Sequence, residues 1–232
     1  MFFYSFDSIW TYVVIVLPAV ILAMWASANV NSTYKKYSKV ISKSGYTAND
    51  VVRNILDAYG LHHVRIEHVS GDLTDHYDPK ANVIRLSDTT DGSRSAAAIG
   101  VAAHEAGHAV QHAVGYGPIK LRMVIIPVCN IGSTLSMPLI LLGIVLSYPP
   151  LCYLGILAFA TATFFQLVTL PVEFNASKRA LAILENAGMP DEDVNASKKV
   201  LTAAALTYVA ALAVSLANLL RLILIVNGRS RD

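Results

Sequence analysis

The residues with the clearest chemical potential are His104, Glu105 and His108, which form the pattern H-E-x-x-H. Residues four apart lie on the same face of an α-helix, so both imidazoles can reach one cation. Two histidines and a carboxylate are a ligand set typical of catalytic zinc, and they leave a fourth position open for water. Glu105 lies beside the ligand stripe, where it could accept a proton from that water. The pattern therefore predicts one catalytic Zn²⁺ per chain.

A pair of structural histidines without a metal is the alternative interpretation of this motif. The surrounding sequence favours the metal, because Ala-rich segments flank the motif and no proline interrupts residues 96–112. Alanine is the strongest helix former, so the spacing of four residues should be realised on a helix. We therefore predict a metal site.

The motif supplies two ligands, so a third must come from elsewhere. His112 lies eight residues after His104, which is ~12 Å along a helix and too far to share one ion. The longer three-histidine signature needs its last histidine at the position of Val114, so that signature is absent. Glu173 directly follows a long apolar run and is the strongest carboxylate candidate. It could be the third ligand or a helix N-terminal carboxylate favoured by the helix dipole, and the residues alone leave both open.

The composition is that of a membrane protein. Hydrophobic residues make up 54 % of the 232 residues, charged residues make up 15 %, and the mean hydropathy is +0.49. A signal peptide is the alternative for the first apolar run, but a signal peptide begins with basic residues. The residues before this run include Asp7 and contain no Lys or Arg, so we predict a retained membrane anchor. Four apolar runs are about long enough to cross a bilayer as helices, and they cover residues 9–28, 123–148, 151–170 and 200–226.

Two polar segments lie between these runs, at residues 29–122 and 171–199. Two membrane crossings separate His108 from Glu173, so both residues return to the same side. We therefore expect the first segment to form a catalytic domain that the second completes with the third ligand. Within the first segment, Thr47 with Asp50 three residues later and an apolar stripe after them predict a helix over 47–59. Residue patterns also predict strands over 63–69 and 83–87.

The charges indicate partners and membrane orientation. A net charge of +2 does not suggest nucleic acid, so the bilayer and a protein or peptide substrate are the expected partners. Cytoplasmic segments are enriched in Lys and Arg close to the spans, which places the motif on the cytoplasmic side of the plasma membrane. The basic residues on that side are Lys35, Lys36, Lys39, Lys43, Lys120, Arg122, Lys178, Arg179, Lys198 and Lys199, whereas the other side has Arg229 and Arg231, with Arg221 at the span end.

Five stretches of the sequence, at residues 73–79, 83–87, 101–111, 170–177 and 203–210, carry a resemblance to a known family. They resemble the YugP-like membrane neutral zinc metallopeptidases. The arrangement is more distantly similar to the HtpX-type membrane proteases, whose third ligand is the glutamate of an E-x-x-A-D segment. Glu173 to Ala176 fit that pattern, but Ser177 stands where the aspartate would be. The ligand itself is kept, but the sequence leaves open which residue hydrogen-bonds to the ligands in place of that aspartate. The resemblance runs from Lys35 through the fourth apolar run.

The resemblance implies a fold and strengthens Glu173 as the third ligand. The expected fold is a mainly α, polytopic membrane protein with about four transmembrane helices and a small α+β, zincin-like metalloprotease domain. The expected activity is that of a membrane-embedded zinc metalloendopeptidase, with Glu105 as the general base. A non-catalytic zinc-containing membrane scaffold is the alternative, and the sequence leaves the oligomeric state open.

Two further sets of residues are candidates for contact with the substrate. His76, Tyr77 and Arg179 could each donate a hydrogen bond to the oxyanion that forms during hydrolysis. Their alternatives are a turn that packs against the sheet, for the first two, and a solvated charge, for Arg179. The segment Val83, Ile84, Arg85 and Leu86 could be an edge strand that pairs with an extended substrate, or an ordinary strand of the sheet.

Overall fold

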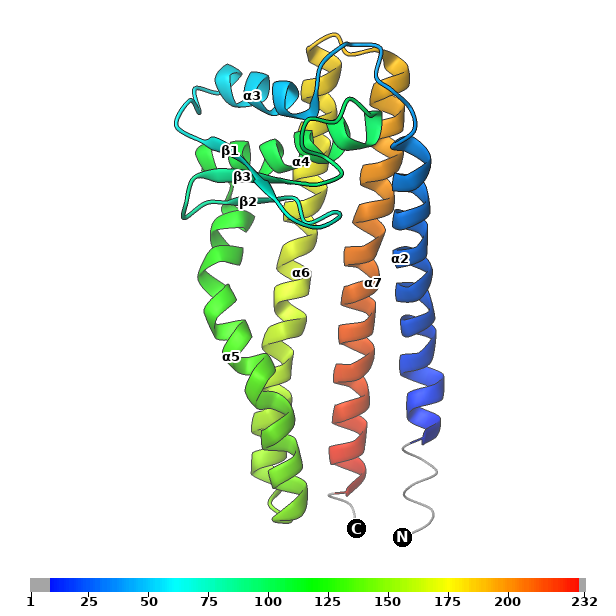
Figure 1. The fold of residues 1–232 in the computed structure, drawn as a ribbon. Coiled ribbons are helices and arrows are strands. Elements are labelled where there is room, and N and C mark those ends of the chain that lie inside the picture. The colour runs from blue at the N-terminus through cyan, green and yellow to red at the C-terminus, as the bar shows by residue number, and fades with distance from the viewer. Residues whose placement is uncertain (1–8, 230–232) are drawn as a thin grey trace. The chain divides into compact units, whose positions relative to one another are not determined.

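The computed structural model describes residues 9–229, and it is mainly helical, as predicted (Figure 1). A π-helical stretch, η1 (Tyr12–Val16), interrupts the first helix and leads into its main part, α2. The remaining elements are, in order, α2 (Leu17–Tyr37), α3 (Ala48–Ala58), β1 (Arg65–Val69), β2 (His76–Asp78), β3 (Val83–Ser87), α4 (Ala96–Ala113), α5 (Gly117–Val145), α6 (Pro149–Asn186) and α7 (Asp191–Arg229).

Four helices are long and apolar enough to cross a membrane, which agrees with the polytopic class expected from the sequence. They cover Ile9–Tyr37, Gly117–Val145, Pro149–Asn186 and Asp191–Asn227. The third helix continues past its apolar run and through Pro171 without a break. Proline inside a long helix is tolerated where other groups satisfy the freed carbonyl. Glu173 therefore lies within α6 rather than in a separate segment.

The chain divides into two compact units, and each is described by itself. One unit contains the chain up to residue 27, residues 121–170 and the chain from residue 207 onward. The other unit contains residues 28–120 and 171–206, and therefore holds α3, the sheet and α4. The functional residues discussed below all belong to this second unit.

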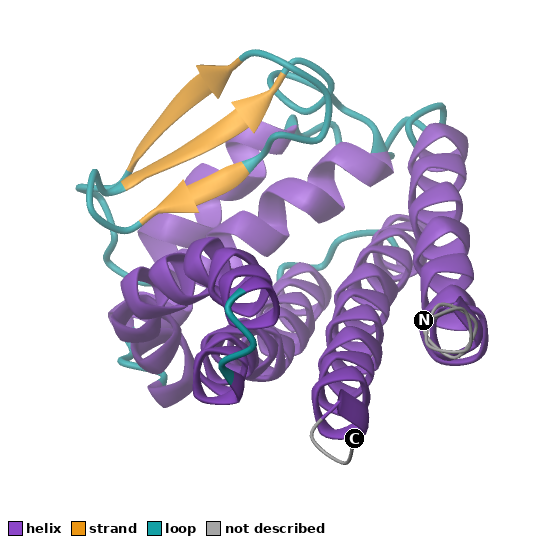
Figure 2. Cartoon of the chain, turned by 90° about the horizontal axis from the view of Figure 1, so that it is seen from below, coloured by secondary structure: helices purple, strands orange, loops and turns teal. Residues whose placement is uncertain are grey.

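The sheet has three strands in the order β1-β3-β2 (Figure 2). β1 pairs with β3 in parallel, and β2 pairs with β3 antiparallel, with Tyr77 opposite Ile84 and His76 opposite Arg85. Of the two alternatives for Val83 to Leu86, the edge strand is therefore wrong and the ordinary strand of the sheet is right, because β3 is the central strand and both its edges are paired. The second edge of β3 is covered by β2, which forms where a turn was one of the alternatives for His76 and Tyr77.

The core of this unit lies between one face of the sheet and helices α3 and α4. Strand β3 contributes Ile84 and Leu86, and α4 contributes its alanines and Ile99. The helix predicted over 47–59 is α3, and a capping box between Thr47 and Asp50 fixes its start, as the sequence indicated. Most of α4 is buried, and its small side chains let neighbouring elements approach closely.

Candidate metal centre

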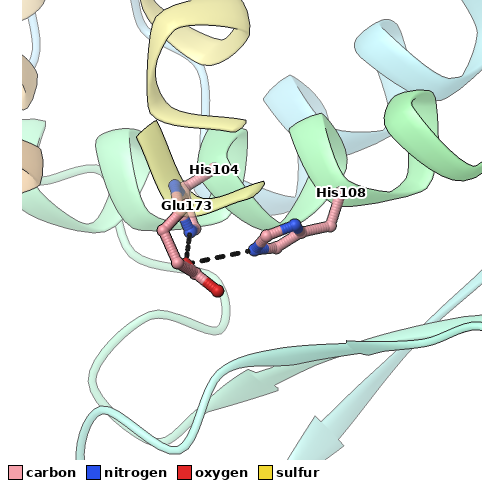
Figure 3. A group of neighbouring side chains, drawn as sticks. All are labelled: His104, His108 and Glu173. Carbon is pink, nitrogen blue, oxygen red and sulfur yellow. Dashed lines mark hydrogen bonds and ion pairs between the residues drawn. The ribbon is translucent and has the colours of Figure 1, made fainter. Parts of the chain in front are cut away.

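Three side chains converge at one point of the second unit (Figure 3). His104 and His108 come from α4, and Glu173 comes from α6. The Oε2 atom of Glu173 lies 3.2 Å from Nε2 of His104 and 3.5 Å from Nε2 of His108. One ligand atom from each of the three residues falls within 4.8 Å of the others. The structure thus brings together the three residues that the sequence proposed as metal ligands.

These separations suit a small tetrahedral ion. Two atoms bound at about 2.0–2.2 Å to such an ion lie about 3.3–3.6 Å apart, which matches the distances from Glu173 to the two imidazoles. Glu173 is only 2 % exposed, and burying an isolated carboxylate is costly unless a partner neutralises it. The residues present therefore fit Zn²⁺ in both chemistry and spacing.

The outer nitrogen of each imidazole has its own hydrogen-bond partner. Nδ1 of His104 lies 3.1 Å from Oγ of Ser177, and Nδ1 of His108 lies 3.0 Å from Oε1 of Gln111. When these outer nitrogens carry the protons, both Nε2 lone pairs face the carboxylate of Glu173, and a cation is the group that satisfies all three acceptors.

Ser177 is the position at which the chain departs from the E-x-x-A-D pattern. The structure places its hydroxyl next to His104, so an oxygen partner for the ring is retained although the carboxylate is not. Glu173 itself lies well inside α6, which begins at Pro149, so the alternative of a helix N-terminal carboxylate is wrong.

Glu105 is buried beside the three ligands but is not one of the clustered group. Its Oε2 atom accepts a hydrogen bond of 2.9 Å from the backbone N–H of Tyr77 in β2. Burial raises the pKa of the Glu105 carboxyl above its ordinary value, although the neighbouring imidazoles act in the opposite direction. A raised carboxyl pKa suits a general base that works near neutral pH.

Tyr77 and His76, two of the candidates for contact with the substrate, lie on opposite faces of the sheet. The hydroxyl of Tyr77 lies 3.2 Å from Nδ1 of His112 on α4, so His112 is engaged with β2 rather than with the ligands. His76 lies on the opposite face of the sheet from Tyr77, because successive residues of a strand alternate. Its ring contacts Arg85 and the carbonyl of Thr74. The structure does not bring His76 or Arg85 to the three ligands.

Arg179 follows the third ligand on α6. Its Nε donates to Oδ1 of Asn175 at 2.8 Å, and its guanidinium lies 6.0 Å from the centre of the Tyr116 ring. Gln111 and Asn175 are functional residues that the sequence did not predict. A signal for Gln111 was present, since a residue three positions after His108 on a helix lies beside it.

Gly107 sets the distance between the two helices that carry the ligands. A Cβ atom at this position would lie 2.8 Å from the backbone carbonyl oxygen of Ala176 on α6. Backbone atoms cannot rotate away, so we expect Gly107→Ala to separate α4 from α6 and to destabilise the protein by about 1–3 kcal/mol. Thermal unfolding of the detergent-solubilised protein measures this loss.

Gly117→Ala is the matched control for this variant. A Cβ placed at Gly117, at the start of α5, would meet no atom of the described residues within 4 Å outside its own helix and chain neighbours. Gly117 is the first residue of α5 and precedes Pro118, so the helix propensity of alanine does not apply in full and the control should change the unfolding temperature little. An unfolding temperature for Gly107→Ala equal to that of the control would show that α4 and α6 do not pack as closely as described.

The comparisons with known proteins agree with this centre. Residues 12–227 match a family model described as "Putative neutral zinc metallopeptidase". The chain is 48 % identical over 223 residues to "Putative membrane protease YugP" of Bacillus subtilis (strain 168), which covers 95 % of this chain and 99 % of the relative. No solved structure matches the chain. The resemblance noted in the sequence is thereby confirmed, and the chain belongs to this family.

Proposed function

We propose that this protein is a membrane-embedded zinc metalloendopeptidase that hydrolyses peptide bonds of membrane or membrane-proximal proteins. The observation that carries the proposal is the convergence of His104, His108 and Glu173 beside the buried carboxylate of Glu105. Four apolar helices and the similarity to a membrane protease support a substrate that lies in or near the membrane.

In the proposed mechanism, His104, His108 and Glu173 would hold one Zn²⁺ per chain. A Zn²⁺ bound there would supply Lewis acidity, which lowers the pKa of water and polarises a peptide carbonyl. Glu105 accepts the proton of the attacking water and delivers it to the leaving amine. The N–H of Tyr77 holds the Glu105 carboxylate in one orientation while its other oxygen stays available for the proton.

Strand β2 is the outer strand of the sheet beside the centre, since β3 lies between β1 and β2. An extended peptide can add to such an edge through main-chain hydrogen bonds. We therefore assign substrate pairing to β2 instead of β3. Tyr77 is the residue of β2 that links this edge to Glu105.

A zinc-dependent cleavage assay tests the proposed activity. The purified protein in lipid nanodiscs is incubated with a mixture of quenched fluorescent peptides and with an unfolded protein. We expect cleavage that stops after zinc is removed with a chelator and returns when zinc is restored. Stoichiometric zinc without cleavage of any of these substrates would favour the non-catalytic zinc-containing scaffold.

The active site is proposed to face the cytoplasm from the plasma membrane, with the C-terminus outside. A reporter that fluoresces only in the cytoplasm should then be dark when fused after Asp232. The same reporter fused after Lys39, beyond the first span, should fluoresce and serves as the matched control. A fluorescent C-terminal fusion would reverse this orientation.

A further inference from the structure

Beyond the three ligands, we propose that Gln111 and Asn175 are positioning residues that fix the tautomer and orientation of His108, and that Arg179 anchors their network. This inference rests on the metal centre proposed above. It concerns how the ligand is prepared, so it can fail while the centre itself stands.

The network is a continuous chain of short hydrogen bonds. Oε1 of Gln111 lies 3.0 Å from Nδ1 of His108. The amide nitrogen of Gln111 donates to the backbone carbonyl of Val172 at 2.8 Å and to Oδ1 of Asn175 at 3.0 Å. The same Oδ1 accepts a hydrogen bond of 2.8 Å from Nε of Arg179.

In this network, each group can be assigned as donor or acceptor in only one consistent way. Nε of Arg179 is always a donor, so the atom of Asn175 that faces it must be the oxygen. This oxygen and the carbonyl of Val172 then both require donors, and the Gln111 amide nitrogen supplies them. The Gln111 oxygen therefore faces His108, where it can only accept. Nδ1 of His108 must carry the proton, which leaves the Nε2 lone pair free for a metal.

Ser177 does not impose the same choice on His104. A hydroxyl can donate or accept, so its contact with Nδ1 is compatible with either tautomer of the ring. Of the two imidazoles, only His108 is therefore held by its surroundings in the tautomer that can bind a metal through Nε2.

Burial makes the Gln111 network costly to disturb. The side chain of Gln111 is fully buried, so a polar group left unpaired there cannot turn to water. Its partners Val172 and Asn175 flank the ligand Glu173 on α6, whereas His108 belongs to α4. The network therefore ties the orientation of one ligand to the helix that carries another.

The same contacts change the role of Arg179. As an oxyanion donor, Arg179 would act on the substrate and leave zinc affinity unaltered. As an anchor, it acts through Asn175, to which its Nε is already bonded. The zinc affinity of Arg179→Met separates the two roles, because only the anchor role predicts weaker binding in this variant.

The test measures the zinc dissociation constant of the full-length protein in detergent by competition with a chromophoric chelator. Gln111→Met removes the acceptor for His108 at similar volume, and Asn175→Leu removes the shared oxygen. Groups that orient metal-bound histidines typically contribute roughly 10–100-fold to affinity, and we expect losses of that size in both variants. Asn175→Asp keeps an oxygen for both donors and should restore the affinity of the wild type.

Two controls distinguish positioning from general destabilisation. Asn218→Leu makes the same change at an asparagine whose amide donates to the carbonyl of Val214 in its own helix, and it should bind zinc normally. The metal-free forms of Asn175→Leu and Asn175→Asp should unfold at similar temperatures. The visible spectrum of the Co²⁺-loaded protein should differ from that of the wild type only in Asn175→Leu.

Three results would overturn the inference. Wild-type zinc affinity in Gln111→Met or Asn175→Leu would show that the network does not prepare His108. An equal loss in Asn175→Asp would show that the shared oxygen is not the operative group. A wild-type protein that binds no zinc would instead remove the metal centre and, with it, the proposed function.

Discussion

Replacement of Glu105 by Gln is expected to abolish peptide hydrolysis while zinc remains bound. The amide cannot accept the proton of the attacking water, and a general base typically contributes roughly 10²–10⁴-fold to the rate. The fold should be unchanged, because the amide oxygen of the variant can still accept the hydrogen bond from the N–H of Tyr77. The measurement compares cleavage rate and zinc content of the same preparation.

Glu185→Gln is the matched control for this variant. Glu185 is an exposed glutamate near the end of α6 and is not one of the clustered ligand residues. The control should hydrolyse peptides at the rate of the wild type. Undiminished cleavage by Glu105→Gln would contradict the assignment of Glu105 as the base, and loss of zinc in that variant would make Glu105 a ligand instead.

Glu173→Gln is expected to weaken zinc binding by at least about 100-fold, beyond the range typical of groups that only orient ligands. The variant keeps the size of the buried side chain but replaces a charged ligand with a neutral amide. Two histidines from one helix would remain, and they lack the negative charge that helps to neutralise the ion. Chelator competition measures the dissociation constant, with Glu185→Gln again as the control.

A different outcome for Glu173→Gln would relocate the third ligand. If this variant bound zinc as the wild type does while His108→Ala did not, the carboxylate that completes the centre would have to lie elsewhere. Helix α6 would then not bring Glu173 to the two histidines of α4, and Gly107→Ala probes the approach of these helices independently.

Local sequence patterns predicted the parts of this fold that depend on neighbouring residues. The four apolar helices follow from hydropathy, and α3 follows from its apolar stripe and the capping box at Thr47. The two histidines could be placed on one helix face because their spacing defines it. For Glu173, spacing alone left two alternatives, and the resemblance to a family favoured the one that the structure supports.

The errors concern contacts between residues distant in the chain. Strand β2 has three residues, too few to show an alternating pattern, so His76 to Asp78 looked like part of a turn. Without β2, the sequence left β3 open as an edge strand or an ordinary strand of the sheet. Asn175 was missed because it approaches Gln111 from another helix.

The central claim is that His104, His108 and Glu173 form a zinc centre, and metal analysis of the detergent-purified protein tests it most directly. We predict one zinc per chain in the wild type and its loss in His108→Ala, measured by elemental analysis on protein of known concentration. A wild-type chain that holds no zinc, even after zinc is added and excess is removed, would contradict the claim.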